Sequence, residues 1–68
     1  MEIKLTRAQL EIIKLLAQGL SNKEIAKEYR RDRRTVEFHI NKIYDKVGLR
    51  RRIKLVNWWN SVKHDYET

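Results

Sequence analysis

The sequence has no cysteine and no proline, and its 68 residues include only two glycines, Gly19 and Gly48. The lack of cysteine excludes a disulfide framework, a thiol nucleophile and a cysteine-ligated zinc site. No segment approaches the roughly 18 consecutive apolar residues of a membrane span, and no signal-peptide pattern opens the chain. We therefore expect a cytoplasmic protein with no membrane contact, formed by a single domain over residues 1–68 with its core at about residues 5–63.

Catalytic patterns are also missing. The carboxylates are dispersed, and neither a Gly-rich phosphate loop nor a nucleophile beside a base stands out. The sequence has only two histidines, His39 and His64, whereas a zinc site requires three or four protein ligands. We expect no enzyme activity, no metal and no cofactor, and we interpret His39 as a structural residue at the edge of the core.

Positive charge is the strongest compositional signal. Sixteen Lys and Arg face nine Asp and Glu, so the net charge is +7. A small domain with this excess favours a polyanionic partner, because Lys and Arg neutralise phosphates and release their counterions. A solvated basic surface without a partner is the alternative on charge alone.

Helix start and stop signals divide the chain into helices. Thr6 and Gln9 form one capping box, and Ser21 and Glu24 form a second. Gly19 fits the left-handed position that ends a helix. The first helix carries an apolar stripe of Leu10, Ile13, Leu16 and Ala17, and the short second helix buries Ile25, Ala26 and Tyr29.

Two further helices follow. The third begins after Asp32, whose carboxylate can cap it, and ends at Gly48. The fourth spans about Arg51 to Lys63, and residues 65–68 are expected to fray. The predicted buried stripes are Val36, Ile40, Ile43 and Val47 on the third helix, and Leu55, Trp59, Val62 and Tyr66 on the fourth. The fold class is therefore all-α, with four helices.

A short capped helix, a tight basic turn and a second capped helix form the layout of a helix-turn-helix, whose second helix enters the DNA major groove. The residues resemble the LuxR/NarL-type (GerE-type) DNA-binding domain over roughly residues 5–59. The resemblance is carried by Leu5-Thr6, by the run from Leu15 to Ala26, by Thr35-Val36 followed by His39, and by Lys46 to Leu49 with Arg52.

This resemblance implies a four-helix domain that regulates transcription in bacteria. Its third helix would contact DNA, its fourth often mediates dimerisation, and Arg52 would be structural. Most members carry a receiver or ligand-sensing domain before this module, and no such domain precedes it in this sequence. We therefore expect either a stand-alone small regulator or an excised C-terminal domain. Arg31 stands where the family usually has a buried Ile or Val, so its head should snorkel outward.

Several residues are candidates for DNA contact. Arg33 and Arg34 adjoin a helix N-terminus that already suits a phosphate, and Lys42 and Arg50 could contact the backbone as well. Thr35 could donate to a phosphate or pack its methyl group. The complete predicted set is Lys23, Arg33, Arg34, Thr35, Glu37, Phe38, Asn41, Lys42 and Arg50.

The exposed face of the third helix carries residues that suit base edges. Asn41 can bond adenine, Glu37 can accept from cytosine N4, and the Phe38 ring can touch a thymine methyl group. Glu37 occupies a position that is commonly Lys in the family, so its charge could instead repel phosphates. Phe38 could instead belong to a protein interface.

Alternatives to a DNA regulator remain open. Ile53, Asn57 and Trp58 lie off the main stripe of the fourth helix and predict a homodimer interface. A protein-interaction module with the same fold, such as an anti-activator or a partner of RNA polymerase or another regulator, is also suggested by Glu37, Phe38 and the adjacent tryptophans Trp58 and Trp59. An RNA-binding module is a weaker alternative, because the chain lacks the aromatic side chains spaced along a basic surface that readers of single strands use.

Overall fold

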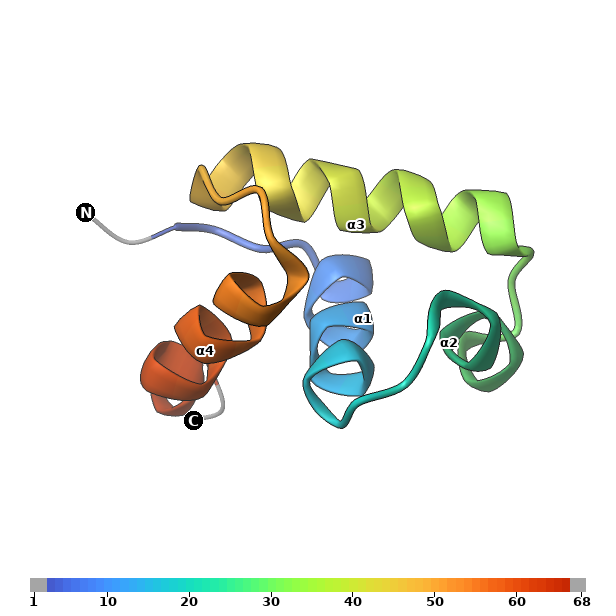
Figure 1. Cartoon of the computed structure of the whole chain (residues 1–68), viewed down its shortest axis with the longest axis horizontal. Coiled ribbons are helices and arrows are strands. Elements are labelled where there is room, and N and C mark those ends of the chain that lie inside the picture. The colour runs from blue at the N-terminus through green and yellow to red at the C-terminus, as the bar shows by residue number, and fades with distance from the viewer. Residues whose placement is uncertain (1–2, 67–68) are drawn as a thin grey trace.

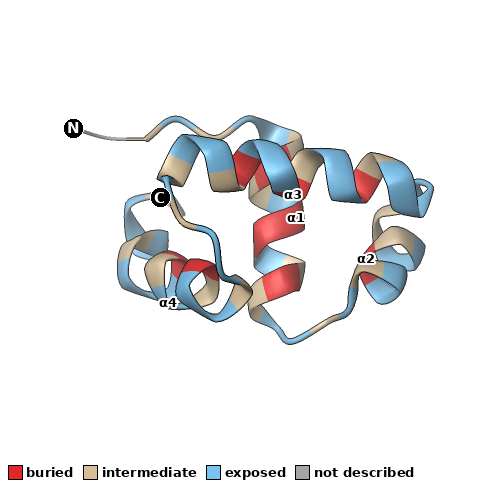
Figure 2. Cartoon of the chain, turned by 45° about the horizontal axis from the view of Figure 1, so that its top comes forward, coloured by how far each residue is buried: buried red, intermediate tan, exposed pale blue. Residues whose placement is uncertain are grey.

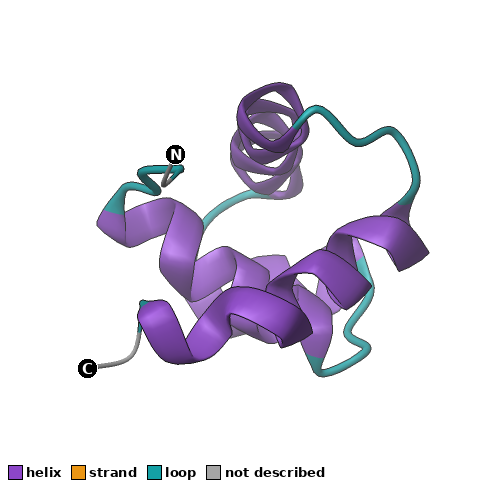
Figure 3. Cartoon of the chain, turned by 90° about the vertical axis from the view of Figure 1, so that its left-hand side faces the viewer, coloured by secondary structure: helices purple, strands orange, loops and turns teal. Residues whose placement is uncertain are grey.

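The computed structural model describes residues 3–66 (Figure 1). Its elements are α1 (Arg7–Ala17), α2 (Asn22–Tyr29), α3 (Arg33–Val47), α4 (Arg52–Val62) and a short 3₁₀ turn, η1 (Lys63–Asp65). These residues contain helices and loops but no strand (Figure 3). The all-α prediction is confirmed, and the predicted ends of the helices agree with the structure to within about two residues.

Both predicted capping boxes are present. The backbone N–H of Gln9 donates to Thr6 Oγ1 at 3.2 Å, and the backbone N–H of Thr6 donates to Gln9 Oε1 at 3.0 Å. At α2 the equivalent bonds join Ser21 and Glu24, at 3.2 and 2.8 Å. The backbone and hydroxyl bonds from Ser21 lower the pKa of the Glu24 carboxyl from its usual value. Side chains therefore satisfy N–H groups that a helix start leaves open.

Left-handed backbone conformations lie at the C-terminal ends of α1, α2 and α3. Gly19 has φ +92° and Gly48 has φ +80°, as the two glycines predict. Arg30 ends α2 with φ +59°, although it carries a side chain. That conformation costs roughly 1–2 kcal/mol for an L-residue. The N–H of Arg31 donates to the Ala26 carbonyl at 3.1 Å and closes the turn that leads into α3.

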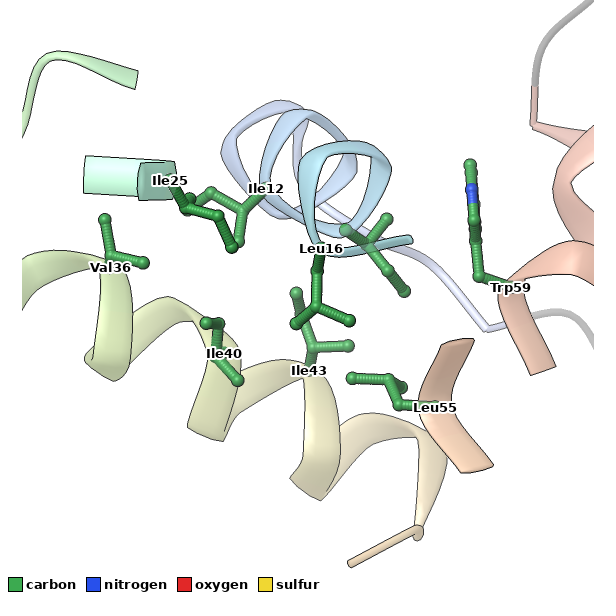
Figure 4. Close-up of a cluster of buried hydrophobic side chains, with 9 residues drawn as sticks. Ile12, Leu16, Ile25, Val36, Ile40, Ile43, Leu55 and Trp59 are labelled. Carbon is green, nitrogen blue, oxygen red and sulfur yellow. The ribbon is translucent and has the colours of Figure 1, made fainter. Parts of the chain in front are cut away.

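Helix α1 is the centre of the fold. It packs against α2, α3 and α4, and α2 also packs against α3. In Figure 1, α2 and α4 flank α1 on either side and α3 crosses above it. Side chains from all four helices meet in one apolar cluster (Figure 4). The buried members are Ile12, Ile13, Leu16, Ile25, Val36, Ile40, Ile43, Leu55 and Trp59.

The predicted stripe on α1 was partly wrong. It included Leu10 and omitted Ile12, whereas Ile12 is fully buried and Leu10 is only half-buried. A single stripe describes a helix that packs on one side. Because α1 has neighbours on three sides, it buries Ile12 and Ile13 together, and these adjacent side chains point about 100° apart.

The C-terminal segment is more ordered than the predicted fraying of residues 65–68. Asp65 belongs to η1, and the Tyr66 ring packs against Trp59 with their centroids 5.6 Å apart. The Tyr66 hydroxyl also donates to the Ile3 carbonyl. An aromatic contact and a hydrogen bond to the other end of the chain therefore hold residue 66, while residues 67–68 lie outside the described part.

A polar contact that sequence analysis did not anticipate joins α3 to the N-terminal segment. Lys46 Nζ donates to Gln9 Oε1 at 2.8 Å and to the Lys4 carbonyl at 2.9 Å. Gln9 is 5% exposed, so its side chain needs such partners. The same oxygen of Gln9 serves the α1 cap and fixes the C-terminal end of α3 against α1.

Candidate nucleic-acid interface

The outer side of α3 is exposed along its length. Helix α3 has 15 residues and is therefore about 22 Å long. Its inner stripe of Val36, Ile40 and Ile43 is buried, and the other helices lie on that side (Figure 2). The side chains on the opposite side are all exposed: Glu37, Phe38, Asn41, Lys42 and Asp45. The geometry therefore presents one free helix face of a width that suits a DNA major groove.

The N-terminus of α3 is capped as predicted. Asp32 Oδ1 accepts the backbone N–H of Thr35 at 2.8 Å, and Thr35 itself is half-buried. Hydrogen bonds from the hydroxyl and then the backbone N–H of Thr35, with a smaller contribution from the charge of Arg34, lower the pKa of the Asp32 carboxyl. A lowered pKa means that the cap stabilises the fold above the ordinary carboxyl pKa and is lost as the pH falls through the lowered value.

Arginines surround this capped end. Arg30, Arg31, Arg33 and Arg34 are all exposed. Arg31 Nη1 donates to the Arg30 carbonyl at 3.0 Å, and its guanidinium carbon lies 5.8 Å from the Tyr29 ring centroid. The head of Arg31 therefore lies at the surface, as expected from its substitution for an apolar residue. Positive charge and the helix N-terminus coincide at this end of α3.

Two contacts along the outer face were missed at the sequence level. Arg33 Nε lies 3.5 Å from Glu37 Oε2, and Lys42 Nζ lies 5.4 Å from the Phe38 ring centroid. Both pairs are four residues apart, the spacing at which side chains meet on a helix. The Phe38 ring also contacts His39 edge-on, with their centroids 5.7 Å apart. The i,i+4 spacing would have revealed both pairs.

The structure gathers only part of the predicted DNA-binding set on this face. Arg50 lies beyond the C-terminal end of α3, where Nη1 is 3.4 Å from Asp45 Oδ1. It therefore lies at the opposite end of the helix from Arg33 and Arg34. Lys23 is exposed in the first turn of α2, which packs against α3.

Helix α4 carries the residues predicted for a dimer interface. Ile53 is 64% exposed and Asn57 is exposed, whereas Trp58 is half-buried against Trp59 and Tyr66. Arg52 has a different role, because Nη1 donates to Asn22 Oδ1 at 2.7 Å and Nη2 donates to the Leu20 carbonyl at 2.6 Å. Arg52 joins α4 to the start of α2, as the family resemblance implies.

Within residues 3–66, no three histidine and acidic side chains lie close enough together to hold a metal ion. Over the same range, no helix combines the length and the apolar character needed to cross a bilayer.

Two capped helices joined by a tight turn, with the second exposed along its outer face, define a helix-turn-helix domain. The model for "Bacterial regulatory proteins, luxR family" matches residues 4–59. The chain belongs to this family, and some of its relatives are named as HTH-type transcriptional regulators. The family resemblance drawn from the sequence is confirmed.

Several relatives are longer proteins. An HTH-type transcriptional regulator of Mycobacterium bovis is 42% identical over 53 residues, which cover 78% of this chain and 6% of the relative. The oxygen regulatory protein NreC of Staphylococcus aureus is 41% identical over 54 residues, covering 79% of this chain and 25% of that protein. Fimbriae Z protein of Escherichia coli is 37% identical over 54 residues, covering 79% and 26%. The chain thus spans 6% of the length of the first relative and about a quarter of the length of each of the other two.

Proposed function

We propose that this domain binds duplex DNA with α3 in the major groove and thereby regulates transcription in the cytoplasm. The observation that carries the proposal is the exposed outer face of α3, which begins at a capped N-terminus surrounded by four exposed arginines. Backbone N–H groups, a helix dipole and guanidinium groups all favour phosphate at that point. No catalytic step is part of this function.

Different side chains contact the phosphates and the bases. Arg33, Arg34 and Lys42 contact the DNA backbone near the centre of the interface, and Arg50 and Lys23 reach it from the flanks. Glu37, Phe38 and Asn41 face the base edges. Backbone contacts supply most of the affinity and set the register, whereas base contacts select the sequence.

Affinity should fall steeply with salt. Five phosphate contacts per protomer correspond to a slope of log K against log salt of about −4.5, at about −0.9 per contact. Fluorescence anisotropy with a duplex obtained by in vitro selection measures this slope over a salt range of roughly 50–200 mM. Arg34→Ala should reduce the slope by about one.

Lys63→Ala is the matched control for Arg34→Ala, because it removes one exposed positive charge from η1 instead of α3. Its slope should equal that of the wild type. A salt-independent affinity, or equal changes from both variants, would contradict binding through α3.

We further propose that two copies associate through α4. The exposed apolar side chain of Ile53, with Asn57 and the edge of Trp58, supports this arrangement. Sedimentation equilibrium, with and without a DNA site that holds two half-sites, should show two protomers. A monomer at high protein concentration and on DNA would refute the dimer.

The protein-interaction alternative is supported by one observation, the 56% exposed ring of Phe38. On that alternative the partner would be RNA polymerase or another regulator. It predicts that Phe38→Ala abolishes a protein complex while the wild-type domain has no affinity for duplex DNA. The same anisotropy titration therefore decides between the two functions.

A further inference from the structure

We propose that Glu37 and Phe38 form a preorganised pair that selects DNA sites containing a cytosine and, within a few base pairs of it, a thymine. Arg33 positions the carboxylate, and His39 and Lys42 hold the ring. The inference rests on the proposed function, because it names the DNA that the α3 face prefers.

The carboxylate of Glu37 is the first member of the pair. Arg33 Nε lies 3.5 Å from Oε2, and both side chains are largely exposed, at 65% for Arg33 and 47% for Glu37. In the part of the chain that the structure describes, no group donates a hydrogen bond to the other oxygen, Oε1. The ion pair therefore offsets the negative charge that would repel phosphates, while Oε1 keeps its capacity to accept a hydrogen bond.

Because Glu37 Oε1 accepts no hydrogen bond from the described residues of the protein, it can discriminate among base edges by accepting one from a base. In the major groove, cytosine N4 and adenine N6 are donors, whereas guanine and thymine present acceptors. Adenine is best matched by an amide, which donates to N7 as well as accepting from N6. A carboxylate cannot donate to N7, so cytosine N4 is the better partner for Glu37.

The ring of Phe38 is the second member of the pair. The ring is 56% exposed, yet it has neighbours on its own helix: the His39 ring edge-on at 5.7 Å and Lys42 Nζ at 5.4 Å. These contacts restrict the ring before any DNA arrives, which reduces the entropy lost on binding. An apolar ring facing the groove has one apolar partner on the bases, the C5-methyl group of thymine.

The two side chains are neighbours in sequence on one helix, so they rise by only about 1.5 Å and turn by about 100° relative to each other. Both lie on the exposed face of α3. They therefore reach bases within a few base pairs of each other in the same half-site, and one docking position satisfies both.

The direct test uses wild-type protein and a duplex selected by it from random sequences. Each thymine is replaced in turn by deoxyuridine, which removes only the methyl group. At one thymine of the half-site the affinity should fall about four-fold, equivalent to about 0.8 kcal/mol for one buried carbon. Phe38→Ala should bind more weakly and lose this sensitivity, whereas Phe38→Leu should retain part of it.

The carboxylate is tested by repeating the selection with two variants. Glu37→Gln should change the preferred base at one position from cytosine to adenine. Arg33→Gln should lower discrimination for that cytosine at least several-fold while the sensitivity to deoxyuridine is unchanged. A uniform loss of affinity at every base would show that Arg33 contacts only phosphate and would overturn its positioning role.

Different results would refute the proposed DNA binding and the selection of bases by Glu37 and Phe38. If the wild type binds no duplex, the proposed function fails, and the inference fails with it. If it binds a selected duplex but tolerates deoxyuridine at every position, or if Glu37→Gln leaves the consensus unchanged, only the paired selection is wrong. Sensitivity to deoxyuridine that persists in Phe38→Ala would likewise assign the methyl contact to another residue.

Discussion

Trp59→Ala should remove most of the stability of this domain. Trp59 is 2% exposed and fills the space between α4 and α1, where it also supports Tyr66. Replacing a buried tryptophan by alanine costs about 3–5 kcal/mol. A chain of 68 residues has a total stability of roughly 3–10 kcal/mol. A thermal melt followed by circular dichroism should show a midpoint temperature lower by at least about 12 °C, or no cooperative transition.

The adjacent tryptophan provides a matched control. Trp58 is half-buried at the edge of the same aromatic group. Trp58→Ala should therefore cost only about 1–2 kcal/mol, in proportion to the smaller apolar area that it buries. Equal losses from the two substitutions would contradict the orientation of α4 in the structure.

Arg52→Met should also destabilise the fold strongly, by about 2–3 kcal/mol. Methionine keeps much of the apolar stem but removes both donors, so the Leu20 carbonyl and the Asn22 side chain lose charge-assisted hydrogen bonds of 2.6 and 2.7 Å. Since these bonds hold α4 against the start of α2, we expect lower DNA affinity at temperatures near the new midpoint. Chemical denaturation measures the loss of free energy of unfolding.

Arg51→Met is the control for the loss of a guanidinium group. Arg51 is exposed at the start of α4, and its side chain makes no hydrogen bond to the helix cap. Its substitution should change the free energy of unfolding by less than about 0.5 kcal/mol. If Arg51→Met and Arg52→Met were equally harmful, charge rather than the two hydrogen bonds would be responsible.

Local sequence signals were sufficient to predict where the helices begin and end and that the fold class is all-α. The capping boxes at Thr6 and Ser21, the Asp32 cap and the two glycines all act within one helical turn, so their partners are near in sequence. The exposed face of α3 also follows from periodicity alone. Even the Arg33–Glu37 pair has a local signal, because the two residues are four positions apart.

Tertiary structure decided the contacts between distant segments. Periodicity could not show that Ile12 is buried, because that depends on how many helices surround α1. Nor could it pair Lys46 with Gln9, or Tyr66 with Ile3, which are 37 and 63 positions apart. Caps and stripes depend on the geometry of one helix, whereas these contacts depend on the relative placement of helices, which is set by packing the whole core at once.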